Sequence, residues 1–311
     1  MSIDWIWNKQ RRYHYRSLSK VQSESRPLTL KASSLHDSRL QCILAHVSHD
    51  WMREHEYETI SYCWGDRIRT SIIEVDGRTL RIPPSAEQAL RRLRNPSSDR
   101  VVWIASVCID QADVHERSQQ VSYMHFIYRH GRSNLIWLGE DDGTISEAAH
   151  ALKMLVEELE SDVIDLQSLC DTLYGSAGFI MFSGTGFGTT FSHDAVLGLY
   201  CRPWFSRLWI VQEITLARCN VCFCGEYEFD LLYILRAAQW LYLKQRFLSP
   251  GHQNPAQLSA VRTAVVLAGY VDPLTGWFAY NESCHFADLL TSLDSFNTRE
   301  PQDQVFACLG I

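Results

Sequence analysis

The sequence has no long hydrophobic run. Nowhere in its 311 residues do apolar side chains approach the roughly 18–20 consecutive positions that a membrane-spanning helix needs. The N-terminus, MSIDWIWNKQRRYHYR, also lacks the order of basic, apolar and small residues that marks a secretory signal peptide. We therefore expect a cytoplasmic protein without a membrane span.

An excess of basic residues is also missing. The formal net charge is −7 at pH 7, which argues against general binding to nucleic acid or to anionic membranes. Basic residues cluster only in the short segments 9–16 and 91–94, and we interpret each as a solvated face.

Two common metal and cofactor patterns are incomplete. Cys219 and Cys222 have CxxC spacing, but no second CxxC or HxxxH pair follows at the spacing of a zinc finger. The Gly-rich segment 175–192 contains GTGFG but lacks the Gly-Lys-Ser/Thr ending of a phosphate loop. We therefore expect no metal and no bound cofactor, a buried strand at the cysteines, and an insertion loop at 175–192.

The chain does contain a regular alternation of strand and helix patterns, and 46% of its residues are hydrophobic. Apolar runs with β-branched residues predict buried strands, and amphipathic segments with start and stop signals predict helices. The predicted strands cover 28–32, 40–47, 57–66, 101–110, 133–140 and 219–224, and the predicted helices cover 84–94, 113–131, 145–160, 203–217, 231–247 and 255–270.

This alternation predicts an α/β fold with a parallel sheet flanked by helices. The Asp76-Gly77 pair between two apolar runs predicts a hairpin at 71–83. We expect a single domain, with the strands 59–63, 101–109, 133–138 and 219–224 adjacent. Its parts are an N-terminal β addition at 1–57, a core at 58–225 with a helical and loop insertion at 141–200, and a helical C-terminal part at 226–311.

Glu213 lies in a mostly apolar run, and burying a carboxylate without a partner is costly. The residue is therefore either half of an ion pair or is used for chemistry. Its partner in the first case would be Arg207, Arg202 or a residue of 111–117.

A continuous helix over 203–217 would place Glu213 on one stripe with Ser206, Trp209 and Ile210. Trp209 would then contribute an apolar wall beside the carboxylate, and we count it among the candidate ligand contacts.

The strand end that contains Ser61, Tyr62, Trp64, Gly65 and Asp66 is predicted at the carboxyl edge of the parallel sheet, where open α/β folds bind ligands. Trp64 would stack on a base or on nicotinamide, or else close a turn as a buried side chain. Gly65 would let the backbone approach a phosphate. The neighbouring cysteine at position 63 has no nucleophile pattern around it and is interpreted as packing.

The end of the next predicted strand supplies a second set of candidates. Asp110 and Gln111 would hold ribose hydroxyls or cap the loop that follows. Asp113 and Glu116 have the spacing of a capping box, which is the preferred interpretation of Glu116. Arg117 would meet a phosphate or Glu213.

Four blocks in this order resemble the fungal heterokaryon-incompatibility (HET) domain: YETISYCWGD, VVWIASVCIDQADVHERSQQVSYMHFIYRHGRSNLIWLGE, RPWFSRLWIVQEITLA and NTREPQDQVFACLGI. Together they span roughly 28–311. HET domains resemble TIR domains as distant relatives, so the resemblance implies a TIR-like, flavodoxin-like sheet. In NAD⁺-cleaving TIR domains a glutamate of the last helix is catalytic, and Glu213 stands at the matching place.

One position departs from the family pattern. HET domains usually have Asp where this chain has Ala105. The alanine is either a natural change or an engineered one. If the acid is essential for catalysis, a chain with alanine here would bind a nucleotide without turning it over.

The resemblance implies two alternative functions in regulated cell death. The first is an NAD⁺ glycohydrolase, with NAD⁺ or a related nucleotide as substrate. The second is a non-catalytic signalling and oligomerisation module. In either case the expected protein partners are further copies of the chain or other death-signalling domains, and segment 110–117 is the expected rim of contact.

Overall fold

The computed structural model describes residues 12–19, 23–65, 68–161, 193–248, 255–271, 296–297 and 303–307. The chain divides into two compact units. The first comprises Met1–Glu140, Leu216–Phe223 and Gly310, and the second comprises Asp141–Thr215, Cys224–Leu309 and Ile311.

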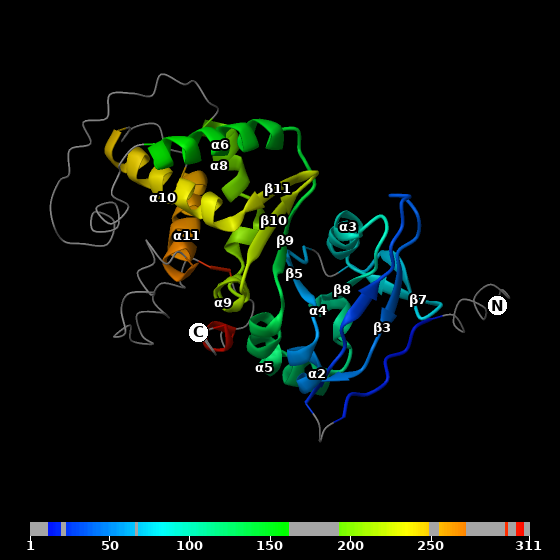
Figure 1. The fold of residues 1–311 in the computed structure, drawn as a ribbon. Helices are drawn as coiled ribbons and strands as arrows, with labels where there is room; N and C mark the ends of the chain where they lie inside the picture. Colours follow the sequence, from blue (N-terminus) through cyan, green and yellow to red (C-terminus); the bar gives the residue numbers. More distant parts are fainter. Residues whose placement is uncertain are drawn as a thin grey trace. The chain divides into compact units, whose positions relative to one another are not determined.

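A large mixed sheet forms the core of the first unit (Figure 1), with the strand order β10-β9-β5-β8-β2-β3-β6-β7. β5 is parallel to both β8 and β9, whereas β2 is antiparallel to both β8 and β3. The bounds are β2 Leu28–Leu30, β3 Gln41–Leu44, β5 Glu58–Tyr62, β6 Ser71–Val75, β7 Arg78–Ile82, β8 Arg100–Trp103, β9 Asn134–Gly139 and β10 Asn220–Cys224.

The predicted α/β class is confirmed, because this sheet is flanked by helices. The four strands expected to be adjacent are neighbours in the order β10-β9-β5-β8. The N-terminal β addition continues the same sheet, since β2 pairs with β8 and β3 pairs with β2.

A row of buried polar side chains ties the central strands together. Thr59 Oγ1 donates to Asn134 Oδ1 at 3.1 Å, and Asn134 Nδ2 donates to Asn220 Oδ1 at 2.9 Å. Thr59 and Asn134 are completely buried, so a slip of one residue would leave their polar atoms without these partners. The row therefore fixes the register of β5, β9 and β10.

The described helices of the first unit are α2 (His49–Glu54), α3 (Pro84–Leu93), α4 (Ala105–Cys108) and α5 (Val114–His130). α3 starts with Pro84 at its first position, where a missing N–H costs nothing. The Asp113 side chain caps α5 by accepting from the N–H groups of His115 and Glu116. α2 was not predicted, and the Ser48 hydroxyl caps it by accepting from Trp51 N–H at 3.2 Å.

The predicted hairpin is confirmed as β6 and β7, which pair antiparallel from Ser71–Ile82 to Val75–Arg78. The two turn residues have positive φ angles, 50° at Asp76 and 73° at Gly77. Two consecutive positive φ angles are the mark of a type I′ turn, whose twist matches that of the flanking strands.

Two predicted strands are followed by a separate element within their expected bounds. The strand expected at 101–110 ends at Trp103, because the N–H groups of Val107 and Cys108 both donate to the Ile104 carbonyl and form the turn of α4. The strand expected at 40–47 ends at Leu44. Beyond it, β4 (Val47–Ser48) pairs with β1 (Glu24–Ser25) in a separate two-stranded sheet.

The arginines of segment 91–94 do not form a solvated face. Arg94 is only 9% exposed, and its guanidinium donates to the carbonyls of Leu35 and His36, both at 2.7 Å. Arg92 lies over the Phe223 ring at 5.0 Å. These side chains therefore hold the loop before β3 and cover β10.

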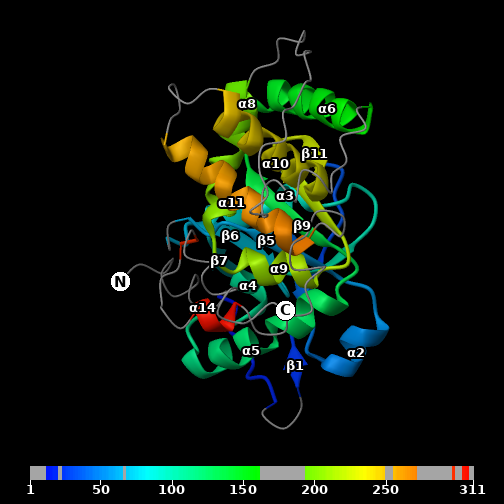
Figure 2. The same cartoon turned by 90° about the vertical axis from the view of Figure 1, so that its left-hand side faces the viewer.

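The second unit is mostly helical. α10 (Leu231–Leu248) packs against α11 (Pro255–Val271), as Figures 1 and 2 both show, and α6 (Ile145–Ser161) packs against α8 (His193–Tyr200). Its other described elements are the 3-10 helix η1 (Pro203–Ser206), α9 (Ile210–Leu216), β11 (Tyr227–Asp230) and α14 (Asp303–Phe306). α8 and β11 were not predicted, and the predicted loop at 175–192 lies outside the described residues.

The prediction of one continuous helix over 203–217 is wrong. Arg207 is extended, with φ −77° and ψ 132°, and separates η1 from α9. The Asn297 N–H donates to the Ser206 carbonyl at 2.6 Å, and the Leu208 N–H donates to the Asn297 carbonyl at 3.3 Å. These long-range bonds use backbone groups that a continuous helix would need for itself.

None of the helices in the described part of the chain has both the length and the hydrophobicity that crossing a lipid bilayer requires.

The type I′ turn gives a direct test of this fold. Gly77→Ala should lower the free energy of unfolding by about 1–2 kcal/mol, because a side chain is disfavoured at this positive φ. Gly198→Ala is the matched control, since Gly198 lies inside α8 with open space around an added methyl group. It should raise stability by about 0.5–1 kcal/mol. Urea titrations measure both effects, and equal effects of the two changes would contradict the turn assignment.

Candidate functional site

The carboxyl ends of two neighbouring strands define the candidate site of the first unit. β5 and β8 are adjacent and parallel, with Glu58 opposite Val102 and Thr59 opposite Trp103. The residues that follow Tyr62 and those that follow Trp103 therefore leave the sheet at the same edge. Open α/β folds bind their ligands at such an edge.

The end of β5 presents an aromatic pair and a glycine. The Ser61 and Tyr62 side chains are almost fully buried, and the Trp64 ring is half-buried and stacks on the Tyr62 ring with centroids 6.4 Å apart. The Trp64 carbonyl accepts from the Ser85 hydroxyl at 3.1 Å, which ties this segment to the first turn of α3. Gly65 has φ +62° and is exposed. Asp66 lies outside the described residues.

The segment after β8 brings three predicted site residues into one hydrogen-bonded loop. Gln111 Nε2 donates to the Ala105 carbonyl at 2.8 Å. Arg117 Nη1 donates to the Gln111 carbonyl at 3.2 Å. The side chains of Gln111 and Arg117 therefore support the loop itself, and their predicted contacts with ribose and phosphate stay predictions.

Asp110 caps this loop, which is one of the two predicted roles of this residue. Its Oδ1 accepts from the Ala112 N–H at 3.0 Å, and its carbonyl accepts from the Asp113 N–H at 3.2 Å. A short-range turn of this kind is a usual role for Asp.

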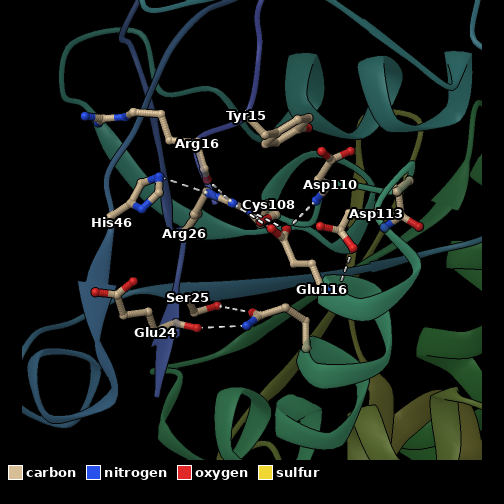
Figure 3. Close-up of polar contacts among 12 residues, drawn as sticks. Tyr15, Arg16, Glu24, Ser25, Arg26, His46, Cys108, Asp110, Asp113 and Glu116 are labelled. Atoms are coloured by element: carbon tan, nitrogen blue, oxygen red, sulfur yellow. Dashed lines mark hydrogen bonds and ion pairs between the residues drawn. The ribbon is translucent and has the colours of Figure 1, made fainter. Parts of the chain in front are cut away.

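The capping box at Asp113 and Glu116 is confirmed in one half only. Asp113 caps α5, but the Glu116 carboxylate turns to a different partner (Figure 3). Its Oε1 and Oε2 accept from Arg26 at 2.5 and 2.7 Å, and Oε1 also accepts from the Asp110 N–H at 2.7 Å. An ion pair with a buried guanidinium is stronger than a bond to one backbone N–H, so the carboxylate points to the arginine.

Arg26 is the residue that sequence reasoning missed. Its side chain is completely buried, and each of its five N–H groups has an acceptor. Besides Glu116, these acceptors are His46 Nε2 at 3.2 Å, the Cys108 carbonyl at 3.4 Å and the Arg16 carbonyl at 2.6 Å. Glu116 is 90 positions away in the chain, so no local pattern pairs the two residues.

Two further side chains complete this buried cluster. The Tyr15 hydroxyl donates to the Val107 carbonyl at 2.7 Å, and the Arg26 guanidinium lies 5.2 Å from the centre of the Tyr15 ring. Burial raises the pKa of Tyr15, and burial raises the pKa of the Cys108 thiol to about 12. Cys108 is thus a neutral core thiol, consistent with reduced packing cysteines.

Glu213 belongs to the second unit. It lies in α9 and is 2% exposed, and Arg207 Nη2 and Nη1 donate to its two carboxylate oxygens at 3.0 and 3.4 Å. The alternative of an ion pair with Arg207 is therefore confirmed. Arg202 instead pairs with Asp142 at 2.8 Å.

The prediction that Ser206, Trp209 and Glu213 lie along one stripe of a single helix is wrong. Ser206 lies in η1, and Trp209 precedes the start of α9 at Ile210. The Trp209 carbonyl still accepts from the Glu213 N–H at 3.1 Å. The structure thus brings Ala105, Asp110, Gln111 and Arg117 together in the first unit and Trp209 and Glu213 together in the second. A pocket shared by both sets stays a prediction.

The cysteines of the CxxC segment fit a strand. Cys222 and Cys224 are buried in β10, and Cys219 is exposed just before it. Within the described ranges, no group of three or more His, Cys, Asp or Glu side chains is placed to hold a metal ion.

Comparison with known proteins gives two matches. The family model described as Heterokaryon incompatibility protein (HET) matches residues 57–213, about half of the chain. The chain is also similar to Heterokaryon incompatibility protein 6, OR allele, from Neurospora crassa, with 28% identity over 236 residues that cover 67% of this chain and 34% of the relative. The chain thus spans about a third of the length of this relative. No solved structure matches the chain.

The His46 contact predicts a pH dependence of stability. Because His46 Nε2 accepts from the Arg26 Nε–H, the imidazole must be neutral. Burial lowers its pKa below 6.5, and the charges of Arg26 and Arg16 act in the same direction. The folded state therefore binds this proton less readily than the unfolded chain. The stabilisation by His46 is present above pH 6.5 and is lost as the pH falls through the lower pKa of the folded state.

His46→Gln tests this, because a Gln oxygen can accept from Arg26 at every pH. Between pH 7 and 5 the unfolding free energy of the wild type should fall more than that of His46→Gln, whereas above pH 7 the difference should be constant. Other titrating groups cancel in this comparison. Two parallel curves across the acidic range would show that His46 does not titrate with folding.

Proposed function

This chain belongs to the heterokaryon incompatibility (HET) family, and from that premise we propose that it acts in fungal heterokaryon incompatibility and regulated cell death as a TIR-like NAD⁺ glycohydrolase. Glu213 is the proposed catalytic carboxylate, and the ends of β5 and β8 supply the proposed nucleotide contacts. The TIR-like arrangement and the substrate are part of the proposal.

The chemistry requires little from the protein. Water adds to the anomeric carbon of the ribose and loses a proton to the solvent, and the carbon–nitrogen bond breaks with its electron pair going to nicotinamide. The leaving group departs neutral from a cationic pyridinium, so it needs no general acid, unlike the leaving oxygen of an ordinary glycoside. One carboxylate can stabilise the oxocarbenium-like ribose electrostatically.

The observation that carries the proposal is the environment of Glu213. The carboxylate is 2% exposed, and its neighbours Ile210, Val211 and Ile214 are also buried. A carboxylate shielded from water acts more strongly on a developing positive charge than a solvated one. The pyrophosphate of a bound dinucleotide would compete with this carboxylate for the Arg207 guanidinium.

A second function is favoured by one observation and by one implication of the family resemblance. Glu213 has a structural partner in Arg207, and the resemblance implies an acid where this chain has Ala105. Both features fit a signalling and oligomerisation module that passes on a death signal without catalysis.

Glu213→Gln distinguishes the two functions when it is made in an Ala105→Asp background. If Glu213 is catalytic, NAD⁺ cleavage should fall at least about 100-fold, because Gln keeps the size but removes the charge. In both cases the change leaves Arg207 without its carboxylate and should cost about 3–5 kcal/mol of stability. If the residue serves only the ion pair, however, turnover per folded molecule should not change. A nicotinamide-release assay and a urea titration on the same variant measure both quantities.

Glu157→Gln in the same background is the matched control. Glu157 is an exposed carboxylate of the second unit, 3.9 Å from Lys153 on α6. Turnover and stability should stay within twofold and about 0.5 kcal/mol of the background, since exposed pairs contribute little. Full turnover by a stably folded Glu213→Gln variant would rule out the proposed catalytic role.

Self-association is the expected way in which activity is controlled. The rim at 110–117 exposes Val114, whose side chain is 58% accessible beside charged neighbours. We expect the specific activity of the Ala105→Asp chain to rise steeply with concentration. Val114→Lys should shift this rise to higher concentration. Sedimentation and activity series at matched concentrations test it, and constant specific activity from a strict monomer would contradict the expectation.

A further inference from the structure

The Arg26 cluster ties three separate segments of the first unit to the candidate site (Figure 3). The first is the N-terminal segment, through the Arg16 carbonyl, and the second is the turn after β3, through His46. The third is the segment after β8, through the Cys108 carbonyl and the Glu116 carboxylate. Arg26 binds the Cys108 carbonyl directly. It also binds Glu116, whose carboxylate accepts from the Asp110 N–H. The guanidinium therefore holds residues 108–110 at both ends.

We propose that Arg26 is a positioning residue for the nucleotide site: it fixes the segment after β8, from α4 to the first turn of α5, which carries Ala105, Asp110, Gln111 and Arg117. This inference rests on the proposed function, because that loop matters for binding only if the carboxyl edge receives the nucleotide. Arg26 itself is completely buried and acts through Glu116 and the loop backbone.

The position of α5 depends much less on Arg26, which separates loop positioning from folding. One helical turn after Glu116, Gln120 is bound twice to the N-terminal strand. Its Oε1 accepts from the Ser25 hydroxyl at 2.7 Å, and its Nε2 donates to the Glu24 carbonyl at 2.8 Å. The Trp103 indole N–H reaches the same Ser25 hydroxyl at 3.2 Å. These bonds hold α5 without the guanidinium.

The geometry requires arginine and not merely a positive charge. Five N–H groups in a planar fork satisfy five acceptors at once, whereas a lysine ammonium has three donors. Arg26→Lys therefore keeps the charge beside Glu116 but cannot serve both carboxylate oxygens and the carbonyls of Cys108 and Arg16. The loop should loosen while the charge balance of the core is retained.

Arg100→Lys is the matched control. Arg100 also forms a two-point ion pair, with the buried Glu58, and it too donates to a backbone carbonyl, that of Leu93 at 2.7 Å. Its pair lies at the start of β5, at the sheet edge opposite to the candidate site. Loss of the fork there should affect stability without moving the loop.

The experiment measures amide hydrogen exchange at Asp110 together with NAD⁺ affinity, for the full 311-residue chain and both variants. In Arg26→Lys, the Asp110 amide should exchange at least about tenfold faster and NAD⁺ should bind about five- to tenfold more weakly. In Arg100→Lys, both quantities should stay within twofold of the wild type. Unchanged exchange at Asp110 in folded Arg26→Lys would overturn the proposal, and so would equal effects of the two variants.

Other outcomes are equally decisive. If the wild-type chain binds no NAD⁺, the proposed function fails, whereas the exchange comparison still decides whether Arg26 holds the loop. If Arg26→Lys does not fold, Glu116→Gln replaces it, since Gln keeps the volume but not the charged acceptor. Failure of both variants to fold, with Arg100→Lys folded, would make the cluster a folding element and reject the positioning role.

Discussion

The burial of one guanidinium constrains the carboxyl edge of the sheet in the first unit. A charge removed from water is tolerated only when its hydrogen-bonding groups are satisfied, and Arg26 finds all five acceptors in three segments of the chain. Its carboxylate partner is 90 positions away. The shape of the segment after β8 is therefore decided by Arg26, which lies just before the strand that β8 pairs with, as much as by the residues of that segment.

Local sequence patterns predicted the elements whose hydrogen bonds are local or whose burial is complete. β5 is buried at all five positions, and its apolar run was recognisable. The turn at Asp76-Gly77 and the cap at Asp113 follow from the conformations and side-chain bonds of single residues. In contrast, the break at Arg207 depends on Asn297, which is far away in the chain, and no pattern near residue 207 indicates it.

The same division holds for the candidate sites. The apolar surroundings of Glu213 predicted its burial, and because an isolated buried carboxylate is costly they left two interpretations open, an ion pair or a role in chemistry. The choice between Arg207 and Arg202 was not predictable, since it depends on how the chain leaves η1. Glu116 shows the opposite case. Its spacing to Asp113 predicted a local capping role, but its carboxylate accepts stronger hydrogen bonds from the distant Arg26.

The pairing of β2 with β8 has a consequence for how this domain can be cut. The family match begins at residue 57, whereas β2 is at Leu28–Leu30 and Arg26 lies just before it. A recombinant fragment trimmed to the matched region would expose the unpaired backbone groups of β8, and an open strand edge promotes aggregation. It would also leave the Glu116 carboxylate without its cation. The shortest piece that can be expressed intact is therefore longer than the segment by which the family is recognised.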